Sequence, residues 1–363
     1  MVRVETPASA AMASMLVRLY PSRPKTVRAP WVMARCFLAL PPGRPVPDVR
    51  GAAAASGSAG AVGAVLRDAS SCSGGPCPNY RARCTSLSGP CATRRPARVA
   101  RAPQSLVLVD VRWFLDGRSG HDAYLAGHLP GAVWADVDTV LSAPPDETDG
   151  RHPLPDPADF ARALGALGIG DGTAVVAYDA DGGPYAARLV WLLRRTGRSA
   201  ALLDGGLSGW PHGTETGDVT LPEAWLTPVE WPTEVLRSAD EVAAGDAVVL
   251  DARAADRYSG ETVLPTDIRS GHIPGARSAP WSANLTADGT FATPRQLREL
   301  YEELGVREGV EVVVYCGSGV TACHDLLALE HAGITGAALY PGSWSAWSAD
   351  LSRPVATGQE PGQ

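Results

Sequence analysis

An internal repeat constrains the fold of this chain more than any other feature of its sequence. Four blocks occur twice in the same order: LVDVR 108–112 and VLDAR 249–253, GHLPGA 127–132 and GHIPGA 271–276, AVVAYD 174–179 and VVVYC 312–316, and LDGGLSGW 203–210 and YPGSWSAW 340–347. Matched blocks in one order indicate a duplicated domain. Each copy alternates strands with helices, and this alternation predicts an α/β fold in which each domain is a parallel sheet flanked by helices on both faces.

The third block ends differently in the two copies, and the difference predicts chemistry in the second. There a buried strand delivers Cys316 into a glycine-rich loop that opens a helix near Thr321. Gly317 and Gly319 let loop amides point at the sulfur, and the positive end of the helix favours the thiolate. The first copy has Asp179 instead, which cannot accept and release sulfur; we expect it to cap the helix that follows.

The content of this loop separates the reactions open to such a cysteine. A cysteine-based phosphatase needs a longer loop, closed by an arginine that clamps the phosphoryl group. Here the sixth residue after Cys316 is Ala322, and no arginine lies inside the loop. The loop is therefore better suited to one additional anionic sulfur, as in a cysteine persulfide, than to phosphate or arsenate.

The string Cys316-Gly-Ser-Gly-Val-Thr-Ala resembles the active-site loop of the rhodanese superfamily, in the form seen in 3-mercaptopyruvate sulfurtransferases. The resemblance to two-domain rhodaneses covers roughly residues 104 to 352. It implies transfer of sulfur from 3-mercaptopyruvate to a thiol or cyanide acceptor through a Cys316 persulfide. Thiosulfate is the alternative donor, although thiosulfate enzymes usually have Arg and Lys where this loop has Gly317 and Ser318. A module that carries or senses sulfur without turnover is a further alternative.

The resemblance also implies catalytic roles for three residues. Cys316 is the nucleophile, and Ser318 and His128 form a proton relay in which Asp122 is a possible acid partner. Histidine in a Gly-His-x-Pro-Gly turn can instead tie the turn down through its ring nitrogen, which is an equal alternative for His128 and suffices for His272. The persulfide is held by loop residues, namely Gly317, Gly319, Val320 and Thr321.

Arginines are the expected ligands of an anionic donor. Arg257 matches the family arginine that contacts substrate, with pairing to a nearby loop acid as the structural alternative. Mercaptopyruvate enzymes generally have a second arginine where this chain reads LPTD at 264–267, and Arg269 is the nearest candidate to replace it. We expect Arg253 to brace the end of its strand and Cys323 to be a small buried helix residue rather than a resolving thiol.

Charge divides the chain into two parts. Residues 1–104 contain 15 basic and 3 acidic residues, whereas 105–363 contain 17 basic and 36 acidic residues. The acidic part is an unfavourable partner for nucleic acid, and a small anionic donor would need a local cationic pocket there. No segment predicts a membrane span. The resemblance implies no cofactor and no metal, and the cysteines at 72–91 lack the paired C-x2-C spacing of a zinc site.

These observations predict five segments. We expect 1–103 to be a disordered or mis-started extension, 104–215 a rhodanese-like domain without the catalytic cysteine, 216–232 a linker, 233–353 the catalytic rhodanese-like domain, and 354–363 a flexible tail. The expected location is cytoplasmic, or an organelle matrix if the Arg-rich extension is a transit peptide. The expected partners are a small anionic sulfur donor and a thiol acceptor such as thioredoxin or a small thiol.

Overall fold

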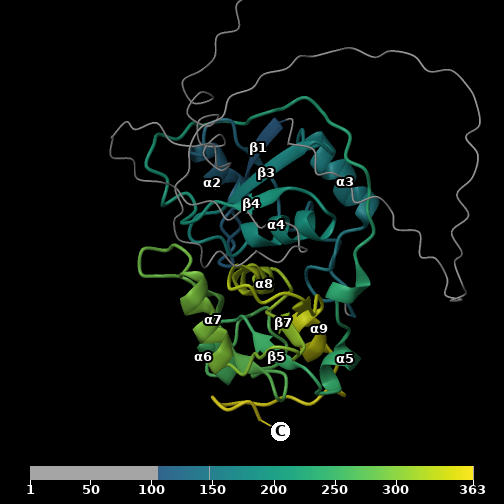
Figure 1. Cartoon of the computed structure of the whole chain (residues 1–363). Helices are drawn as coiled ribbons and strands as arrows, with labels where there is room; N and C mark the ends of the chain where they lie inside the picture. The colour runs from purple at the N-terminus through teal and green to yellow at the C-terminus, as the bar shows by residue number, and fades with distance from the viewer. Residues whose placement is uncertain (1–104, 147, 363) are drawn as a thin grey trace, which may run out of the picture. The chain divides into compact units, whose positions relative to one another are not determined.

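The computed structural model describes residues 105–146 and 148–362, which form two domains of the same architecture (Figure 1). The first sheet has the order β2-β1-β3-β4 and the second the order β6-β5-β7-β8, and every strand pair is parallel. The strands are β1 (Ser105–Asp110), β2 (Val133–Trp134), β3 (Thr173–Tyr178), β4 (Ala200–Leu202), β5 (Val248–Asp251), β6 (Arg277–Ser278), β7 (Val312–Tyr315) and β8 (Ala338–Leu339). The predicted α/β fold and its duplication are confirmed, whereas the expectation for 1–103 lies outside the described residues.

Helices flank each sheet, and α2, α3, α5 and α7 begin at residues whose side chains cap them. Asp156 accepts hydrogen bonds from the first amides of α3, and Thr293 forms a reciprocal capping box with Gln296 at the start of α7. The helices are α2 (Gly120–Ala126), α3 (Pro157–Ala166), α4 (Ala186–Arg195), α5 (Ala239–Ala243), α6 (Ala255–Ser259), α7 (Pro294–Glu303), α8 (Ala322–His331) and α9 (Ser343–Ala349), with short 3-10 turns η1 (Thr233–Val235) and η2 (Trp281–Asn284).

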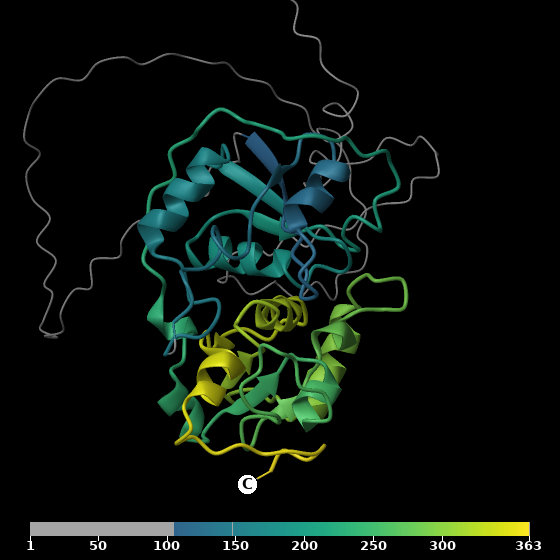
Figure 2. The same cartoon turned by 180° about the vertical axis from the view of Figure 1, so that it is seen from behind.

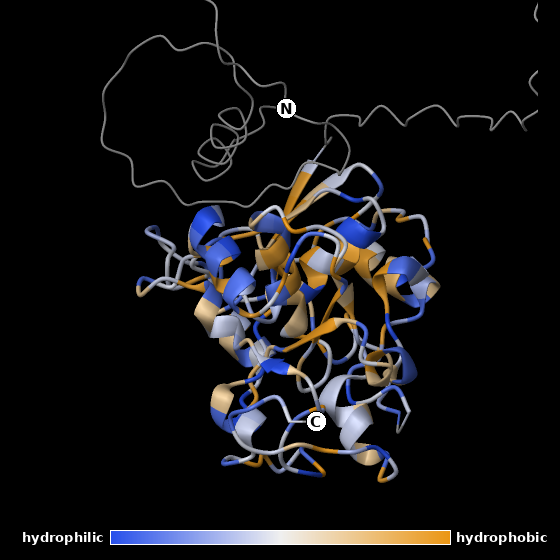
Figure 3. Ribbon diagram, turned by 60° about the horizontal axis from the view of Figure 1, so that its bottom comes forward, coloured by the Kyte–Doolittle hydropathy of each residue, from blue (hydrophilic) through white to orange (hydrophobic). Residues whose placement is uncertain are grey.

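The central strands are apolar because helices cover both faces of each sheet. All four residues of β7, the sequence VVVY, are buried, and the strands are mostly orange in the hydropathy view (Figure 3). A continuous β-branched run of this kind is typical of a parallel strand with no solvated face. The active-site loop therefore starts from a rigid, fully buried strand.

The Gly-His-x-Pro-Gly turns are built alike in both domains. His272 donates from Nδ1 to the carbonyl of Tyr258 (2.9 Å), and its ring stacks on that tyrosine. Arg253 forms a buried ion pair with Asp251 and donates to the carbonyl of Gly271. The predictions that His272 and Arg253 are structural are confirmed.

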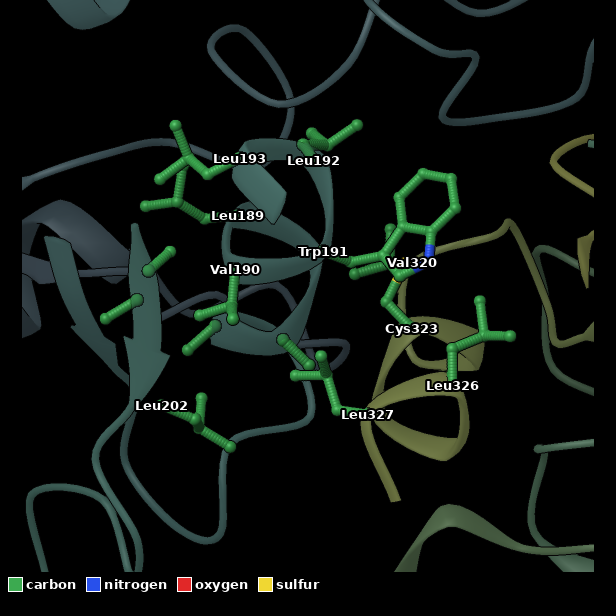
Figure 4. Packing of buried hydrophobic residues seen from close by; sticks show 14 of the residues in the cluster. Leu189, Val190, Trp191, Leu192, Leu193, Leu202, Val320, Cys323, Leu326 and Leu327 are labelled. Carbon is green, nitrogen blue, oxygen red and sulfur yellow. The ribbon is translucent and has the colours of Figure 1, made fainter. Parts of the chain in front are cut away.

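Helices α4 and α8 bring the two domains together, and they lie side by side in both views (Figures 1 and 2). Trp191 on α4 packs beside Val320 and Cys323 at the start of α8, in a core cluster that spans both domains (Figure 4). Each fully buried large apolar side chain stabilises such a contact by about 1.5–3 kcal/mol. This apolar contact fixes the first domain against the loop that carries Cys316.

A loop from each domain also packs against the other domain. Loop 150–153 of the first domain approaches the start of α9: a Cβ added at Gly150, where φ is +85°, would lie 2.5 Å from Ser345 Oγ. Loop 285–291 of the second domain approaches the segment after β4, where the Phe291 amide donates to Asp204 (2.8 Å). We call these two segments the crossing loops.

The C-terminal residues 354–362 correct one expectation. They were expected to be a flexible tail, but Ala356 exchanges two backbone hydrogen bonds with His272, and the Pro361 carbonyl accepts from the Gly275 amide (2.7 Å). These bonds hold the segment against the second Gly-His-x-Pro-Gly turn.

Across 105–146 and 148–362, none of the helices combines the length and apolar character that crossing a bilayer requires.

Candidate active site

Cys316 directly follows β7, and its loop is held by the start of α9. The carbonyl of Cys316 accepts from the Trp344 amide (2.9 Å), and the carbonyl of Gly317 accepts from the Ser345 amide (3.0 Å). With these carbonyls engaged by α9, the Gly319 amide is free to donate to Cys316 Sγ at 3.1 Å. The side chain is 2% exposed. The loop therefore presents a buried sulfur with a backbone N–H directed at it, as the sequence predicts.

Gly319 meets a steric requirement of this loop. Its φ is +80°, in the left-handed region, and an added Cβ would lie 2.6 Å from the carbonyl oxygen of Pro341. A side chain at this position would force either the loop of Cys316 or the segment after β8 to move. The other predicted persulfide ligands, Gly317, Val320 and Thr321, line the same pocket as Cys316.

Ser318 is hydrogen-bonded to a histidine, but not to the one that the sequence indicated. Its Oγ lies 2.6 Å from Nδ1 of His152, and Nε2 of that ring lies 2.9 Å from Asp138 Oδ1. Trp113 donates its indole N–H to the same carboxylate (3.0 Å). The hydrogen bond from His152 is the main reason that the pKa of Asp138 lies below its usual value. The result is an ordered Ser–His–Asp chain beside Cys316.

The expectation for His128 and Asp122 is therefore corrected. His128 Nδ1 bonds the carbonyl of Tyr124 (2.9 Å), its ring stacks on that tyrosine, and its Nε2 lies 3.4 Å from Glu215. The Nδ1 bond and the stacking recur at His272 in the other domain, so the repeated turn needs the histidine itself. Asp122 is exposed in the first turn of α2 and takes no part in the chain of Ser318.

The sequence contained a signal for His152. It lies in the segment RHPLP at 151–155, between two of the repeated blocks, and the corresponding stretch of the second copy, 284–293, has no histidine. A residue required by the fold recurs in both copies of a duplicated domain, as His128 and His272 do. A histidine present in only one copy is thus the better candidate for chemistry.

Two arginines converge on the loop, one from each domain. Arg257 makes a bidentate pair with Asp267, with distances of 2.8 and 2.9 Å from Nη2 to the two carboxylate oxygens. A Cβ added at Gly317 would lie 3.1 Å from Nη2 of Arg257 and 3.2 Å from Nη2 of Arg151. Glycine at 317 therefore leaves the space in which both guanidinium groups approach the loop. Arg151 is absent from the sequence-based expectations.

Arg269 cannot supply a second substrate ligand in this arrangement. Its guanidinium donates to four main-chain carbonyls at 2.8–3.0 Å, those of Trp347, Ser348, Asp350 and Arg353. It anchors the chain that follows α9. The expectation that Arg269 could replace the missing family arginine therefore finds no support in its contacts.

Arg188, on α4, donates hydrogen bonds to the loop of Cys316 and to the segment of His152. It is fully buried, and it donates to the carbonyls of Gly319 (3.0 Å), His152 (3.3 Å) and Pro153 (3.5 Å). One guanidinium thus fixes the loop of Cys316 and the segment of His152 relative to each other.

Cys323 and Asp179 behave as the sequence predicts. Cys323 is buried on α8, its thiol donates to the Gly319 carbonyl (3.5 Å), and burial raises its pKa to about 12. A thiol so resistant to ionisation is a poor resolving group. Asp179 accepts from the amides of Gly183, Tyr185 and Ala186 at 2.8–3.1 Å, capping α4, while burial raises its pKa to about 7.

Both domains line one pocket over Cys316. Its residues are Trp113, Leu115, Val137, Arg151, His152 and Tyr185 from the first domain and Arg257, Cys316, Gly317, Ser318, Val320 and Thr321 from the second. A nucleophilic sulfur, a backbone amide aimed at it, a Ser–His–Asp chain and two guanidinium groups meet in this space. These groups can attack a sulfur donor, move a proton and bind an anion.

Named relatives match most of the described chain. A relative from Pseudomonas aeruginosa, named "Probable 3-mercaptopyruvate sulfurtransferase", is 43% identical over 266 residues, which is 70% of this chain and 93% of the relative. SseB of Mycobacterium tuberculosis, whose name places it among the thiosulfate sulfurtransferases, is 39% identical over 270 residues, 72% of this chain and 94% of its own length.

A solved structure shares the fold. The 3-mercaptopyruvate sulfurtransferase from Leishmania major superposes with a TM-score of 0.61 at 31% sequence identity, covering 69% of this chain and 72% of that one. The family model for the rhodanese-like domain matches residues 97–212 and 236–350, one match for each copy of the repeat. The chain therefore belongs to the rhodanese family and carries two rhodanese-like domains.

Proposed function

We propose that this protein transfers sulfur from 3-mercaptopyruvate to a thiol acceptor through a persulfide on Cys316. The observation that carries the choice of donor is the chain of Ser318, His152 and Asp138 beside the nucleophile. Loss of sulfur from mercaptopyruvate leaves a carbanionic enolate that must be protonated, whereas loss of sulfite from thiosulfate requires no proton. A proton relay at this position is useful only for the first donor.

The first half-reaction begins with the Cys316 thiolate attacking the donor sulfur. The new S–S bond forms as the bond between sulfur and C3 breaks, and the electron pair passes to C3 of pyruvate enolate. The donor S–H proton is taken up by the relay through Ser318, and the relay returns one proton to C3, so that pyruvate leaves and a Cys316 persulfide anion remains. Arg257 orients the donor through its carboxylate.

The second half-reaction returns the enzyme to its starting state. A thiol attacks the outer sulfur, which leaves as an acceptor persulfide, and the Cys316 thiolate is regenerated. The Gly319 amide, already 3.1 Å from Cys316 Sγ, and the neighbouring loop amides as far as Thr321 stabilise the anionic outer sulfur meanwhile. Sulfurtransferases use sulfur donors and thiol acceptors in general; thioredoxin, a small thiol and cyanide are the acceptors proposed here.

Thiosulfate is the second candidate donor, because one group of relatives is named for it and because two arginines flank the loop. A module that is persulfidated without turnover is a further alternative function.

A cytoplasmic location, where thiols are kept reduced, suits a catalytic cysteine of this kind.

The decisive experiment compares specificity constants for 3-mercaptopyruvate and thiosulfate on the full chain. We expect mercaptopyruvate to be preferred by at least about tenfold, which corresponds to about 1.4 kcal/mol of differential transition-state binding. Equal or reversed specificity constants would overturn the assignment of the donor. Steady-state release of pyruvate in the presence of a thiol would exclude the module without turnover.

A further inference from the structure

The formal charges in the pocket do not favour an anionic donor unless Arg151 is counted. Arg257 is held in a bidentate pair with Asp267, whose side chain is 4% exposed, so this pair is formally neutral. Adding the Cys316 thiolate gives a net charge of −1. A carboxylate-bearing donor would then enter a negatively charged pocket. The rest of 105–363 also has more acidic than basic residues, and such a field repels anions. Arg151 brings the sum over Arg257, Asp267, Cys316 and itself to zero, and Asp138 is a further acidic group, bonded to His152.

The position of Arg151 is set by its backbone rather than by an acidic partner. Its amide donates to Ser345 Oγ at 3.1 Å, and Gly150 before it permits the close approach to α9. The next residue, His152, is bonded to Ser318. Among the described residues Asp267 and Asp138 act on the Arg151 guanidinium only through space, with no salt bridge to it, and its buried Nε has no hydrogen-bond partner. A cation held in this way is available to a ligand.

We propose that Arg151, delivered across the domain interface, is the residue that binds the anionic group of the sulfur donor and thereby determines which donors are accepted. The inference rests on the proposed sulfur transfer. Its ligand class is a small molecule with a carboxylate, or an equivalent oxyanion such as a sulfonate, close to the transferable sulfur. The planar guanidinium matches two oxygens of such a group. Arg257, pre-oriented by Asp267, contributes the second donor to the same anion.

This placement explains how the pocket functions without a second arginine in segment 264–267. That segment instead supplies Asp267, which accepts from Nε and Nη2 of Arg257 but not from Nη1. The lost positive charge is supplied by the first domain, one residue before the histidine of the relay. Donor binding and proton transfer thus depend on adjacent residues of one crossing loop.

The first test uses alkylating reagents and needs no sulfur donor. Iodoacetate and iodoacetamide react with the same thiolate, displacing iodide, and differ in carrying a carboxylate or a neutral amide. In the unmodified protein we expect Arg151 to raise the rate constant for Cys316 with iodoacetate relative to that with iodoacetamide. The substitution Arg151→Gln should lower this ratio about tenfold, by removing the local cation. The matched control, Arg162→Gln, alters an exposed arginine paired with Asp159 and should leave the ratio unchanged.

An unchanged ratio in Arg151→Gln would overturn the role of Arg151 whether or not the protein transfers sulfur. The failure of the inference is in this way separated from failure of the proposed function. Thermal unfolding of the variant checks its fold, which we expect to be intact because the substitution keeps the backbone bond to Ser345.

The second test measures sulfur transfer. Arg151→Gln should raise KM for the preferred donor by about tenfold or more while kcat changes by less than about threefold, since uniform binding of the anion is lost. Arg151→Lys retains the charge without the planar fork and should recover part of the affinity. A fall in kcat at constant KM would contradict a binding role. If mercaptopyruvate is not a substrate, the same measurement with thiosulfate still tests the residue.

Discussion

His152 bridges Ser318 and Asp138, whereas His128 and His272 bond main-chain carbonyls of the helices that precede their turns. The three side chains are chemically identical, and their surroundings assign the roles. At the turns, stacking on a tyrosine and a carbonyl partner hold the ring in place. At 152, one ring nitrogen meets a hydroxyl and the other a carboxylate, so a proton can pass through the ring.

This difference predicts a donor-specific effect of His152→Gln. We expect kcat/KM for 3-mercaptopyruvate to fall about a hundredfold, because enolate protonation loses its general acid, whereas kcat/KM for thiosulfate changes by less than about threefold. Steady-state kinetics with both donors provide the measurement. Loss of both activities to the same extent would show that His152 only supports the fold.

His128→Gln is the comparison for that experiment. It removes a fully buried ring from a turn that the fold requires, so thermal stability should fall. The ratio of the two specificity constants should stay the same, because His128 lies outside the chain of Ser318. A changed ratio would restore His128 to the catalytic group.

At the scale of elements, α4 links the catalytic loop to the relay. Arg188 on this helix is surrounded by carbonyl oxygens of Gly319, His152, Pro153 and Leu141, with distances of 3.0–3.5 Å. Its charge is dispersed over the dipoles of these carbonyls. A helix of the non-catalytic domain thereby positions groups of both domains.

Arg188→Met should therefore affect stability and turnover together. Buried carbonyls lose their donor, which we expect to cost about 3 kcal/mol of unfolding free energy. In the folded protein, kcat should fall while KM for the donor changes little, since the nucleophile and the relay lose their alignment but Arg151 and Arg257 remain. Denaturant unfolding and steady-state kinetics measure the two effects. An unchanged kcat in the folded protein would show that the loop holds itself without this bond.

At the scale of the whole molecule, a buried polar cluster connects α8 to the first domain. His324 Nε2 bonds the carbonyl of Gly182 in the first domain (3.1 Å), and Nδ1 lies 3.2 Å from Asn284 Nδ2. Asn284 also donates to the buried Asp325. The ring of His324 is fully buried and stacks on Phe291.

Burial lowers the pKa of His324 from 6.5 to about 4, which predicts acid sensitivity. Since the unfolded chain binds the proton more readily, the contribution of this residue is complete above about pH 6.5 and is lost as the pH falls towards 4, by up to about 3 kcal/mol. His324→Gln should make the decline in stability across that window shallower. Urea unfolding at several pH values measures the difference, and Asp325, whose raised pKa acts in the opposite direction, is present in both proteins. Parallel curves for the two proteins would contradict the prediction.

The fold and the loop that holds Cys316 could be predicted from the sequence because both leave local patterns. The repeated blocks revealed the duplication, and the run VVVYCGSG identified Cys316. His152, Asp138 and Arg151 could not be assigned in the same way, because they enter the pocket through a contact between segments about 165 residues apart in sequence. Only the absence of a second copy of His152 hinted at its role.

The crossing loops have a consequence for how the two halves of this polypeptide depend on each other. Under the proposed function, the nucleophile Cys316 belongs to the C-terminal half, whereas Arg151, His152 and Asp138 belong to the N-terminal half. We expect a fragment consisting of 233–353 alone to retain a sulfur-accepting thiol but to lose most of its selectivity among sulfur donors. Because both halves are parts of one chain, they are always present in equal amounts. Each Cys316 is therefore synthesised together with the first-domain residues that line its pocket.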